Sequence, residues 1–143
     1  MLFRSGEVLI QTAFPEHHLF NALRSQDYNA YAATLLNERE IAQFPPYIYL
    51  AIIRAEANEY APVQQFLSNA LEMGRSLSNE VLIYDVVRPQ MERLKGMERG
   101  QLLMQAKTRA ALQNLLRNLT PQLREHPLNN KIRWVVDVDP LEF

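Results

Sequence analysis

The sequence contains no cysteine among its 143 residues. This absence excludes a disulfide framework, a thiolate zinc site and a cysteine nucleophile, and it fits a reducing compartment, so we expect a cytoplasmic protein. Long apolar runs are missing too. The longest, Ile48–Ile53 and Leu102–Met104, are far shorter than the roughly 20 residues of a membrane-spanning helix. We therefore expect a soluble domain without a membrane partner.

Neither sign of charge is in excess, because 15 Lys and Arg residues face 16 Asp and Glu residues. No whole-chain field attracts nucleic acid, so any such contact needs a local basic patch. The four glycines are scattered, and no G-x-x-x-x-G-K-S/T sequence is present to hold phosphates. The sequence therefore predicts a binding domain without catalytic residues, metal or cofactor of its own.

The first part of the chain predicts one strand followed by two helices. Gly6–Thr12 has strand composition but no neighbour along the chain, so we expect its sheet partners to precede it in a longer protein. Apolar residues at helical spacing follow over Glu16–Phe44, with Asp27 as the N-cap between two helices. Two prolines then stop the second helix. The predicted parts of the chain are residues 1–45 and 46–143.

The second part predicts the order β-α-β-β-α-β. Runs with strand character are Tyr47–Ala57, Val81–Val87, Gln101–Lys107 and Ile132–Val138, and the helices cover about 62–74 and 109–123. This order is that of the ferredoxin-like split βαβ fold, an α+β arrangement with two helices on one face of an antiparallel sheet. Residues 88–100 are predicted as a charged loop.

Individual residues refine these boundaries. Pro62 suits the first turn of its helix, Gly74 offers a stop, and Thr108 can cap the second helix. Pro121 predicts a kink in the second helix or a restart with Thr120 as a new cap. In the last strand, Ile132, Trp134, Val136 and Val138 alternate with polar residues, so we expect them to face the core.

Two weak constellations could carry chemistry. His17 and His18 are adjacent, which on a helix turns them about 100° apart, and His126 lies far along the chain, so a solvated pair fits better than a metal site. Asp137 and Asp139 would share a strand face and could hold a cation. No nucleophile or further ligand accompanies them, so a solvated strand end is the preferred interpretation.

A group of basic residues on the second predicted helix is a stronger candidate site. Arg109, Gln113 and Arg117 recur every four residues on the second helix, and Lys107 precedes that helix. Arg109 also lies in the first turn, where unpaired N–H groups favour a carboxylate or phosphate. The pattern predicts an anion-binding stripe, and a merely solvated helix face is the alternative.

The charged loop is a second candidate anion surface, through Arg88, Arg93, Lys95 and Arg99, with Glu92 and Glu98 among them. It contains no aromatic residue on which a base could stack, which makes it the weaker candidate. A solvated hairpin is the preferred interpretation of this segment.

Several motifs together resemble one family over nearly the whole chain: Gly6–Thr12 with Pro15-Glu-His17, Asp27-Tyr28, Glu38-Arg39, Pro45-Pro46 and the closing Trp134-Val-Val-Asp-Val-Asp-Pro140. They look like the C-terminal end of the primosomal protein N′ (PriA) family of bacterial replication-restart helicases. The resemblance implies an ATP-dependent 3′-5′ DNA helicase in which ATP, magnesium and zinc belong to parts of the protein outside this sequence.

By this resemblance, residues 1–45 would be the tail of the second helicase lobe with connecting helices, and 46–143 the C-terminal domain. That domain would contact single-stranded or forked DNA and help to bind the acidic tail of single-stranded DNA-binding protein through Arg109 and Gln113. Other primosome proteins would be partners of the whole helicase. The sequence departs from the family at Asp85-Val86 and Met97-Glu98-Arg99, where relatives have Gly-Pro and Arg-aromatic-Arg, so the charged loop is less basic.

Two other functions stay open at this point. Ferredoxin-like domains also serve as regulatory modules for small molecules such as amino acids, although the segment 58–62 after the first strand has no glycine-rich ligand turn. A domain of this size could also act only as a structural brace for the helicase lobes.

Overall fold

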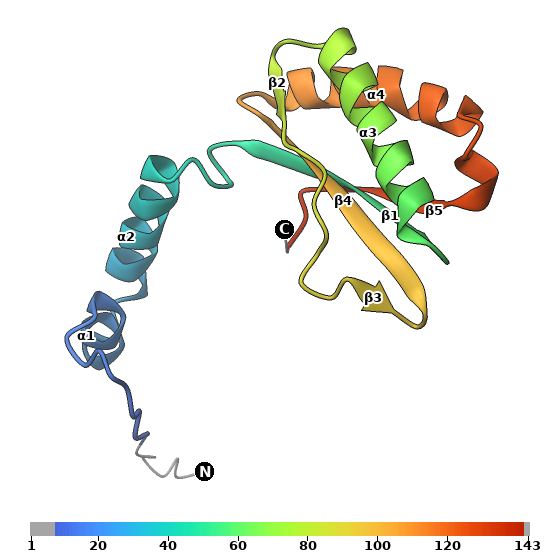
Figure 1. Cartoon of the computed structure of the whole chain (residues 1–143). Helices are drawn as coiled ribbons and strands as arrows, with labels where there is room; N and C mark the ends of the chain where they lie inside the picture. The colour runs from blue at the N-terminus through green and yellow to red at the C-terminus, as the bar shows by residue number, and fades with distance from the viewer. Residues whose placement is uncertain (1–7, 142–143) are drawn as a thin grey trace, which may run out of the picture. The chain divides into compact units, whose positions relative to one another are not determined.

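The computed structural model describes residues 8–141 (Figure 1). Contacts divide the chain into two compact units between Ala42 and Gln43, a few residues before the two prolines at which the sequence predicts a boundary. In the described part of the chain, no helix is both long and apolar enough to cross a bilayer. Each unit is described by itself.

The N-terminal unit consists of two helices, α1 (His18–Ser25) and α2 (Tyr28–Ile41). A side chain caps each helix: His17 Nδ1 accepts a hydrogen bond from the N–H of Leu19 at 3.2 Å, and Asp27 Oδ1 accepts one from the N–H of Ala30 at 3.0 Å. The prediction of Asp27 as an N-cap is confirmed. Within described residues 8–42, neither helix has a fully buried side chain.

The predicted strand Gly6–Thr12 is not found over its described part, because residues 8–12 belong to no strand. Gly6 and Glu7 lie outside the described residues. A strand is defined by hydrogen bonds to a neighbour, and none of the described residues pairs with this segment.

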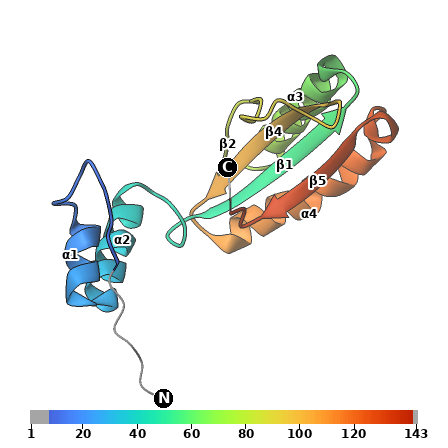
Figure 2. The ribbon, with the colours of Figure 1, turned by 90° about the horizontal axis from the view of Figure 1, so that it is seen from below.

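The C-terminal unit has the predicted ferredoxin-like order. Its strands are β1 (Tyr49–Ala57), β2 (Val81–Ile83), β3 (Arg93–Leu94), β4 (Met97–Ala106) and β5 (Arg133–Val138), and its helices are α3 (Tyr60–Leu77), α4 (Arg109–Glu125) and a 3₁₀ turn (Asn129–Lys131). The antiparallel sheet has the order β2-β4-β1-β5, and β3 pairs with β4. Figures 1 and 2 show α3 and α4 together on one face of this sheet.

The core lies between that face and the two helices. On α3 the apolar residues Val63, Phe66, Leu67 and Ala70 recur at spacings of three and four, so one stripe of the helix is buried. They meet alternate residues of the strands, such as Ile53 and Leu102, which are completely buried. Burying a Leu, Ile or Phe side chain stabilises a fold by about 1.5–3 kcal/mol, so this layer holds the domain together.

Gly74 does not end α3, contrary to the prediction, because the helix continues to Leu77. The glycine is buried where α3 crosses β2. A Cβ atom at this position would lie 2.5 Å from the Cδ1 atom of Ile83. Close packing of the helix on the sheet, rather than helix termination, is therefore what favours a glycine here, because a Cβ atom would displace the end of the Ile83 side chain.

The predicted strand Val81–Val87 is shorter in the structure. The strand ends at Ile83, and beyond it the N–H of Tyr84 donates to the carbonyl of Leu103 at 3.0 Å and an isolated bridge joins Val87 to Gln101. Between these two points the register of the edge slips by one residue relative to β4. Such a bulge breaks the hydrogen-bond ladder locally while the chain still follows the edge of the sheet.

The predicted charged loop is in part a β-hairpin. β4 begins at Met97 rather than at Gln101, and β3 pairs with its first residues. Lys95 and Gly96 form the two-residue turn, with φ angles of 50° and 84°. Two successive positive φ angles suit the right-handed twist of a hairpin, which explains why a charged segment can still form strands.

Pro121 lies inside one continuous helix, α4, so the predicted restart at Thr120 is wrong. The proline removes the hydrogen bond to the carbonyl of Arg117, a residue on the exposed side of the helix where water can replace it. For the last strand the prediction holds for Ile132, which is buried just before β5, and for Trp134 and Val136, which pack against the core. It is wrong for Val138, which is 41 % exposed at the strand end.

Candidate anion-binding sites

The first candidate site is the start of α4. Thr108 Oγ1 accepts a hydrogen bond from the N–H of Ala111 at 3.2 Å, which caps the helix as predicted and fixes Arg109 in the first turn. The Arg109 side chain is 71 % exposed, and its Nη2 atom lies 3.9 Å from Asp139 Oδ2. Its guanidinium also lies over the ring of Tyr49, 5.6 Å from the ring centroid. An exposed cation is thus held at the positive end of a helix.

The remaining residues of the stripe follow along the same helix. Gln113 is half-buried one turn beyond Arg109, and Arg117 is exposed another turn on, with its Nη1 atom 3.5 Å from Asn114 Oδ1. Lys107 is exposed at the turn before the helix. It lines a separate hollow of about 470 Å³, together with Gln43, Glu80, Leu82, Gln105, Ala106, Thr108 and Ala111. The structure therefore places Arg109 and Gln113 on one helix face and Lys107 beside it.

The second candidate site is the face of the sheet opposite the helices. Along β4, buried residues alternate with half-buried ones, and the half-buried Arg99 points away from the helices. On the neighbouring β1, Glu56 is directly opposite Arg99 of β4 on one side and Arg133 of β5 on the other. Arg54 lies two residues earlier on the same face of β1. Three arginines from three adjacent strands therefore share this face, which we call the open face.

Ion pairs connect these side chains across the strands. Arg133 Nη1 lies 3.4 Å from Glu56 Oε1, and Arg54 pairs with Asp137 on β5. The side chains of Arg54 and Asp137 are 30 % and 36 % exposed, whereas that of Arg133 is 85 % exposed. Solvent-exposed pairs of this kind contribute little to stability, but they set the direction of each guanidinium.

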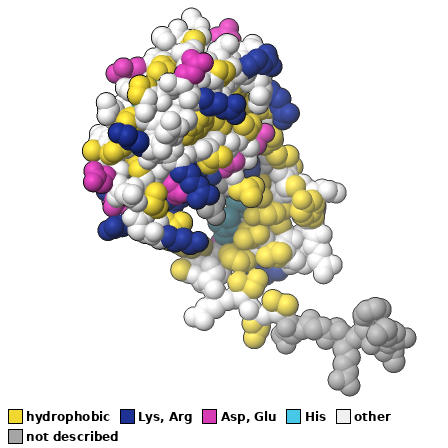
Figure 3. Space-filling view, turned by 90° about the vertical axis from the view of Figure 1, so that its right-hand side faces the viewer, with side chains coloured by type: hydrophobic (Ala, Val, Ile, Leu, Met, Phe, Trp, Pro, Cys, Tyr) yellow, Lys and Arg dark blue, Asp and Glu magenta, His cyan; other side chains and the backbone are white. Residues whose placement is uncertain are grey.

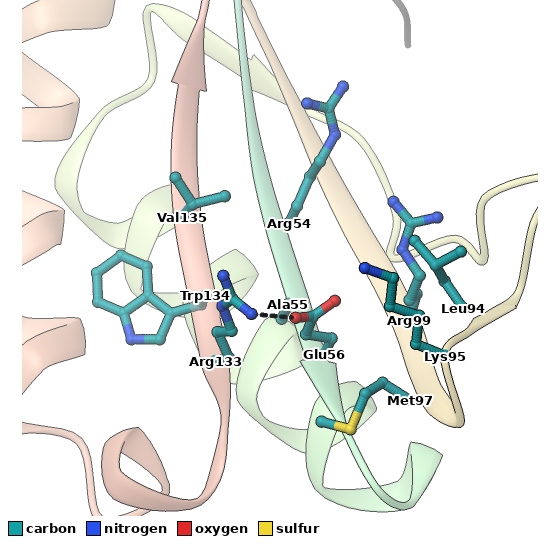
Figure 4. Close-up of a pocket in the computed structure, with 10 residues that line it drawn as sticks. All are labelled: Arg54, Ala55, Glu56, Leu94, Lys95, Met97, Arg99, Arg133, Trp134 and Val135. Carbon is teal, nitrogen blue, oxygen red and sulfur yellow. Dashed lines mark ion pairs between the residues drawn. The ribbon is translucent and has the colours of Figure 1, made fainter.

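A hollow of about 690 Å³ lies on the open face beside the β3–β4 hairpin (Figure 4). Its described lining residues are Arg54, Ala55, Glu56, Leu94, Lys95, Met97, Arg99, Arg133, Trp134 and Val135. Four of them are cationic and one is a carboxylate. On the face that Figure 3 shows, basic and acidic side chains are interspersed. Since the whole chain has a formal charge of -1, the excess of cations around the hollow is local.

The hairpin that borders the hollow is fixed by Arg88. Its guanidinium lies over the Tyr60 ring, 3.7 Å from the centroid, and pairs with Glu92 at 2.8 Å and with Glu98 at 3.8 Å. The hydrogen bond to Glu92 raises the pKa of Arg88 above its usual value, so this cation stays charged. Arg93 is held on the same side of the hairpin, 3.6 Å from Glu98.

The structure thus separates the residues that the sequence nominated for the charged loop. Lys95 and Arg99 line the hollow on the open face, whereas Arg93 pairs on the other side of the hairpin. Arg54 and Arg133 were missed. One signal in the sequence could have found them: the polar positions of the predicted strands must share the face of the sheet that no helix covers. Each of these strands contributes only one arginine to that face, so no single segment shows a basic cluster.

The structure also shows where the histidines and the two C-terminal aspartates lie. Among the described residues, no group of three or more His, Asp and Glu side chains could hold a metal ion. His18 lies 3.6 Å from Glu38 in the N-terminal unit. Asp137 and Asp139 do not act as a pair, because Asp137 faces Arg54 and Asp139 faces Arg109.

Comparison with known proteins gives a family match. The model of the primosomal protein N C-terminal domain matches residues 40–141. The chain is 31 % identical over 142 residues to replication restart protein PriA of Haemophilus influenzae, covering 98 % of this chain and 19 % of the relative. For the proteins of the same name from Chlamydia pneumoniae and Bacillus subtilis the identities are 26 % and 21 %, over 95 % and 96 % of this chain and 18 % and 17 % of the relatives.

The chain therefore spans about a fifth of the length of the curated relatives that it matches. Among solved structures, the de novo designed protein Foldit4 is similar, with a TM-score of 0.51 and 14 % identity over 65 % of this chain and 97 % of that protein. A likeness at this identity concerns the fold alone.

Proposed function

Because this chain belongs to the family of primosomal protein N C-terminal domains, we propose that it is the DNA- and partner-binding domain of a replication-restart helicase. The family match over residues 40–141 carries this proposal, and the replication restart proteins that it resembles along 98 % of its length support it. Strand separation by ATP hydrolysis would belong to the remainder of such a protein, with its ATP, magnesium and zinc.

The proposed protein partner is single-stranded DNA-binding protein, whose acidic tail would bind at Arg109 and Gln113. An exposed arginine in the first helical turn can donate two parallel hydrogen bonds to a carboxylate. The amide of Gln113, one turn later, adds a donor for a neighbouring group. Asp139 at 3.9 Å is too distant for a hydrogen bond to Arg109, so an incoming carboxylate can replace it.

The proposed nucleic-acid ligand is single-stranded or forked DNA. The chain as a whole carries a formal charge of -1, so affinity for DNA has to come from a local group of cations. Contacts of cations with phosphates release counterions, and the affinity therefore falls steeply as salt is added. A strong salt dependence is thus part of the proposal.

Fluorescence anisotropy with a labelled acidic tail peptide and a labelled oligonucleotide, at several salt concentrations, tests both parts. We expect both ligands to bind at low salt. Arg109→Ala should weaken peptide binding roughly tenfold or more, since a hydrogen bond to a charged group contributes about 1.5–3 kcal/mol. Arg124→Ala, at the exposed last turn of the same helix, is the matched control and should leave peptide binding unchanged.

Failure of the wild-type chain to bind either ligand at low salt would contradict the proposal. A thermal-shift screen with amino acids then distinguishes the alternative of a regulatory module. Saturable stabilisation by one metabolite, without peptide or DNA binding, would favour that alternative.

A further inference from the structure

The arginines of the open face have no role in the α4 site. Arg109 contacts the ring of Tyr49, at the first residue of β1, whereas Glu56 and its two arginine neighbours lie seven residues along that strand. At about 3.3 Å per residue, this separates Tyr49 from Glu56 by roughly 23 Å. The helices and the open face are also on opposite sides of the sheet (Figure 2). The open face is a separate surface.

The strand register arranges the cations of this surface in a row. Arg99 and Arg133 are both opposite Glu56, so they lie at one level on the two strands that flank β1. Adjacent strands are about 4.8 Å apart, which puts the starting points of these two side chains roughly 10 Å from each other. Arg54 lies two residues before Glu56 on the same face of β1, and Lys95 is in the turn of the hairpin. Such a row matches a ligand with repeated negative charges.

The chemistry of the lining favours a phosphate backbone over stacked bases. Trp134 is the one aromatic among the described residues of the hollow, and it is held towards the core. Its ring centroid is 5.7 Å from that of Phe66, and its Nε1–H donates to Asn129 Oδ1 at 2.9 Å. Because Trp134 is half-buried and packed against Phe66, it is a poor platform for a base. Arginine forks, by contrast, suit the oxygens of phosphodiesters.

Glu56 limits the affinity of the row for an anion. Its carboxylate, only 27 % exposed, stands between Arg99 and Arg133 and pairs with Arg133 at 3.4 Å. It therefore directs the guanidinium but also repels an approaching phosphate. Because Arg133 is 85 % exposed, its bond to Glu56 is weak and can be exchanged for one to a ligand.

We propose that the open face, through Arg54, Arg99, Arg133 and Lys95, binds the phosphodiester backbone of nucleic acid without regard to base sequence, and that Glu56 restrains this binding. The inference rests on the proposed function, since DNA is the ligand proposed there, and it assigns that ligand to a surface. A chain with the acidic peptide bound at α4 then still binds DNA on the open face.

The test compares variants of the full chain by anisotropy with three labelled probes: a single-stranded oligonucleotide, a duplex of equal length and the acidic peptide. Arg99→Gln with Arg133→Gln should weaken binding of the single strand, the duplex or both by roughly tenfold per lost charge-assisted contact. The salt slope for a single strand should fall by about 1.4, at roughly 0.7 per contact. Peptide binding should not change.

Glu56→Gln is a variant with the opposite expected effect, and a misfolded protein could not produce that effect. It should raise the affinity for the oligonucleotide about two- to fivefold, the size expected for relief of one exposed ion pair. The probe that responds to both sets of variants identifies single-stranded or duplex DNA as the ligand.

The possible outcomes separate this inference from the proposed function. Unchanged DNA binding by the arginine variants, with normal binding by the wild type, would overturn the assignment to the open face and leave the proposed function standing. No DNA binding by the wild type would contradict the proposed function itself. Arg109→Ala should weaken only the peptide, and a parallel loss of DNA binding would contradict the separation of the two sites.

Discussion

The helix-covered face of the sheet and its open face are built from alternate residues of the same strands. On β1, Ile53 and Ala55 face α3 and α4 and are buried, whereas Arg54 and Glu56 face the other way and form ion pairs. Packing on the first face is tight and apolar, so shape decides whether a substitution is tolerated. On the second face Leu50 and Ile52 are also buried, but around Arg54 and Glu56 the surface is polar and partly hydrated, so charge decides there. Stability and binding are therefore expected to respond to different substitutions.

The largest expected effect is on the covered face. Phe66 is fully buried, so Phe66→Ala should lower the free energy of unfolding by about 3–5 kcal/mol. Tyr84→Ala is the aromatic control, because the side chain of Tyr84 is 40 % exposed and its hydroxyl donates to Gln105 Oε1 at 2.6 Å, and it should cost about 1 kcal/mol. Chemical denaturation measures both. Equal losses would show that the comparison of the two faces is wrong.

Gly74 gives the next largest effect. Helix propensity alone predicts that Gly74→Ala stabilises α3 by up to about 1 kcal/mol. Contact of the new Cβ with Ile83 Cδ1, at 2.5 Å, predicts instead a loss of about 1–3 kcal/mol.

Ile83→Val removes that Cδ1 atom, so the double variant separates the two effects. We expect the second substitution to recover most of the loss in a double-mutant cycle of unfolding free energies. Additive losses would contradict the proposed contact between α3 and β2.

How far the sequence predicts this fold depends on the range of the interactions. The order β-α-β-β-α-β and the caps Asp27 and Thr108 follow from neighbours along the chain, and the structure confirms them. Gly74 was misinterpreted because its role depends on Ile83, a residue of another element. A solvated hairpin was among the interpretations of the charged loop, but its strand pairing around Lys95-Gly96 was not predicted, because the charges hid the strand character of the flanking residues.

The candidate sites divide in the same way. Arg109 and Gln113 could be nominated from a helical period and a resemblance, because both belong to one helix. Arg54 and Arg133 come from different strands, and only the antiparallel register brings them to one face. No local pattern contains that register, which is why the open face could not be identified from the sequence.

Smaller changes of stability are expected on the open face. Asp137→Asn removes the charge that pairs with Arg54, and solvent screening should limit the loss to about 1 kcal/mol or less. The same change should strengthen oligonucleotide binding, because it removes a negative charge beside the cations. Denaturation and anisotropy on one sample measure both quantities, and weaker DNA binding in a folded variant would argue against the open face as the DNA surface.

The smallest effect on stability is expected for Arg109→Ala. Its side chain is 71 % exposed, so the free energy of unfolding should change by about 0.5 kcal/mol or less while peptide affinity falls. Thermal denaturation beside the peptide titration separates the two. A large loss of stability would mean that Arg109 braces the start of α4 rather than serving a ligand.

The separation of the two sites is tested most directly by titrating a labelled oligonucleotide into the chain saturated with acidic peptide, at constant ionic strength. Because the α4 site and the open face lie on opposite sides of the sheet, we expect the Kd for the oligonucleotide to stay unchanged and the peptide to remain bound. Displacement of the peptide by the oligonucleotide, in proportion to its occupancy, would show that one surface serves both ligands.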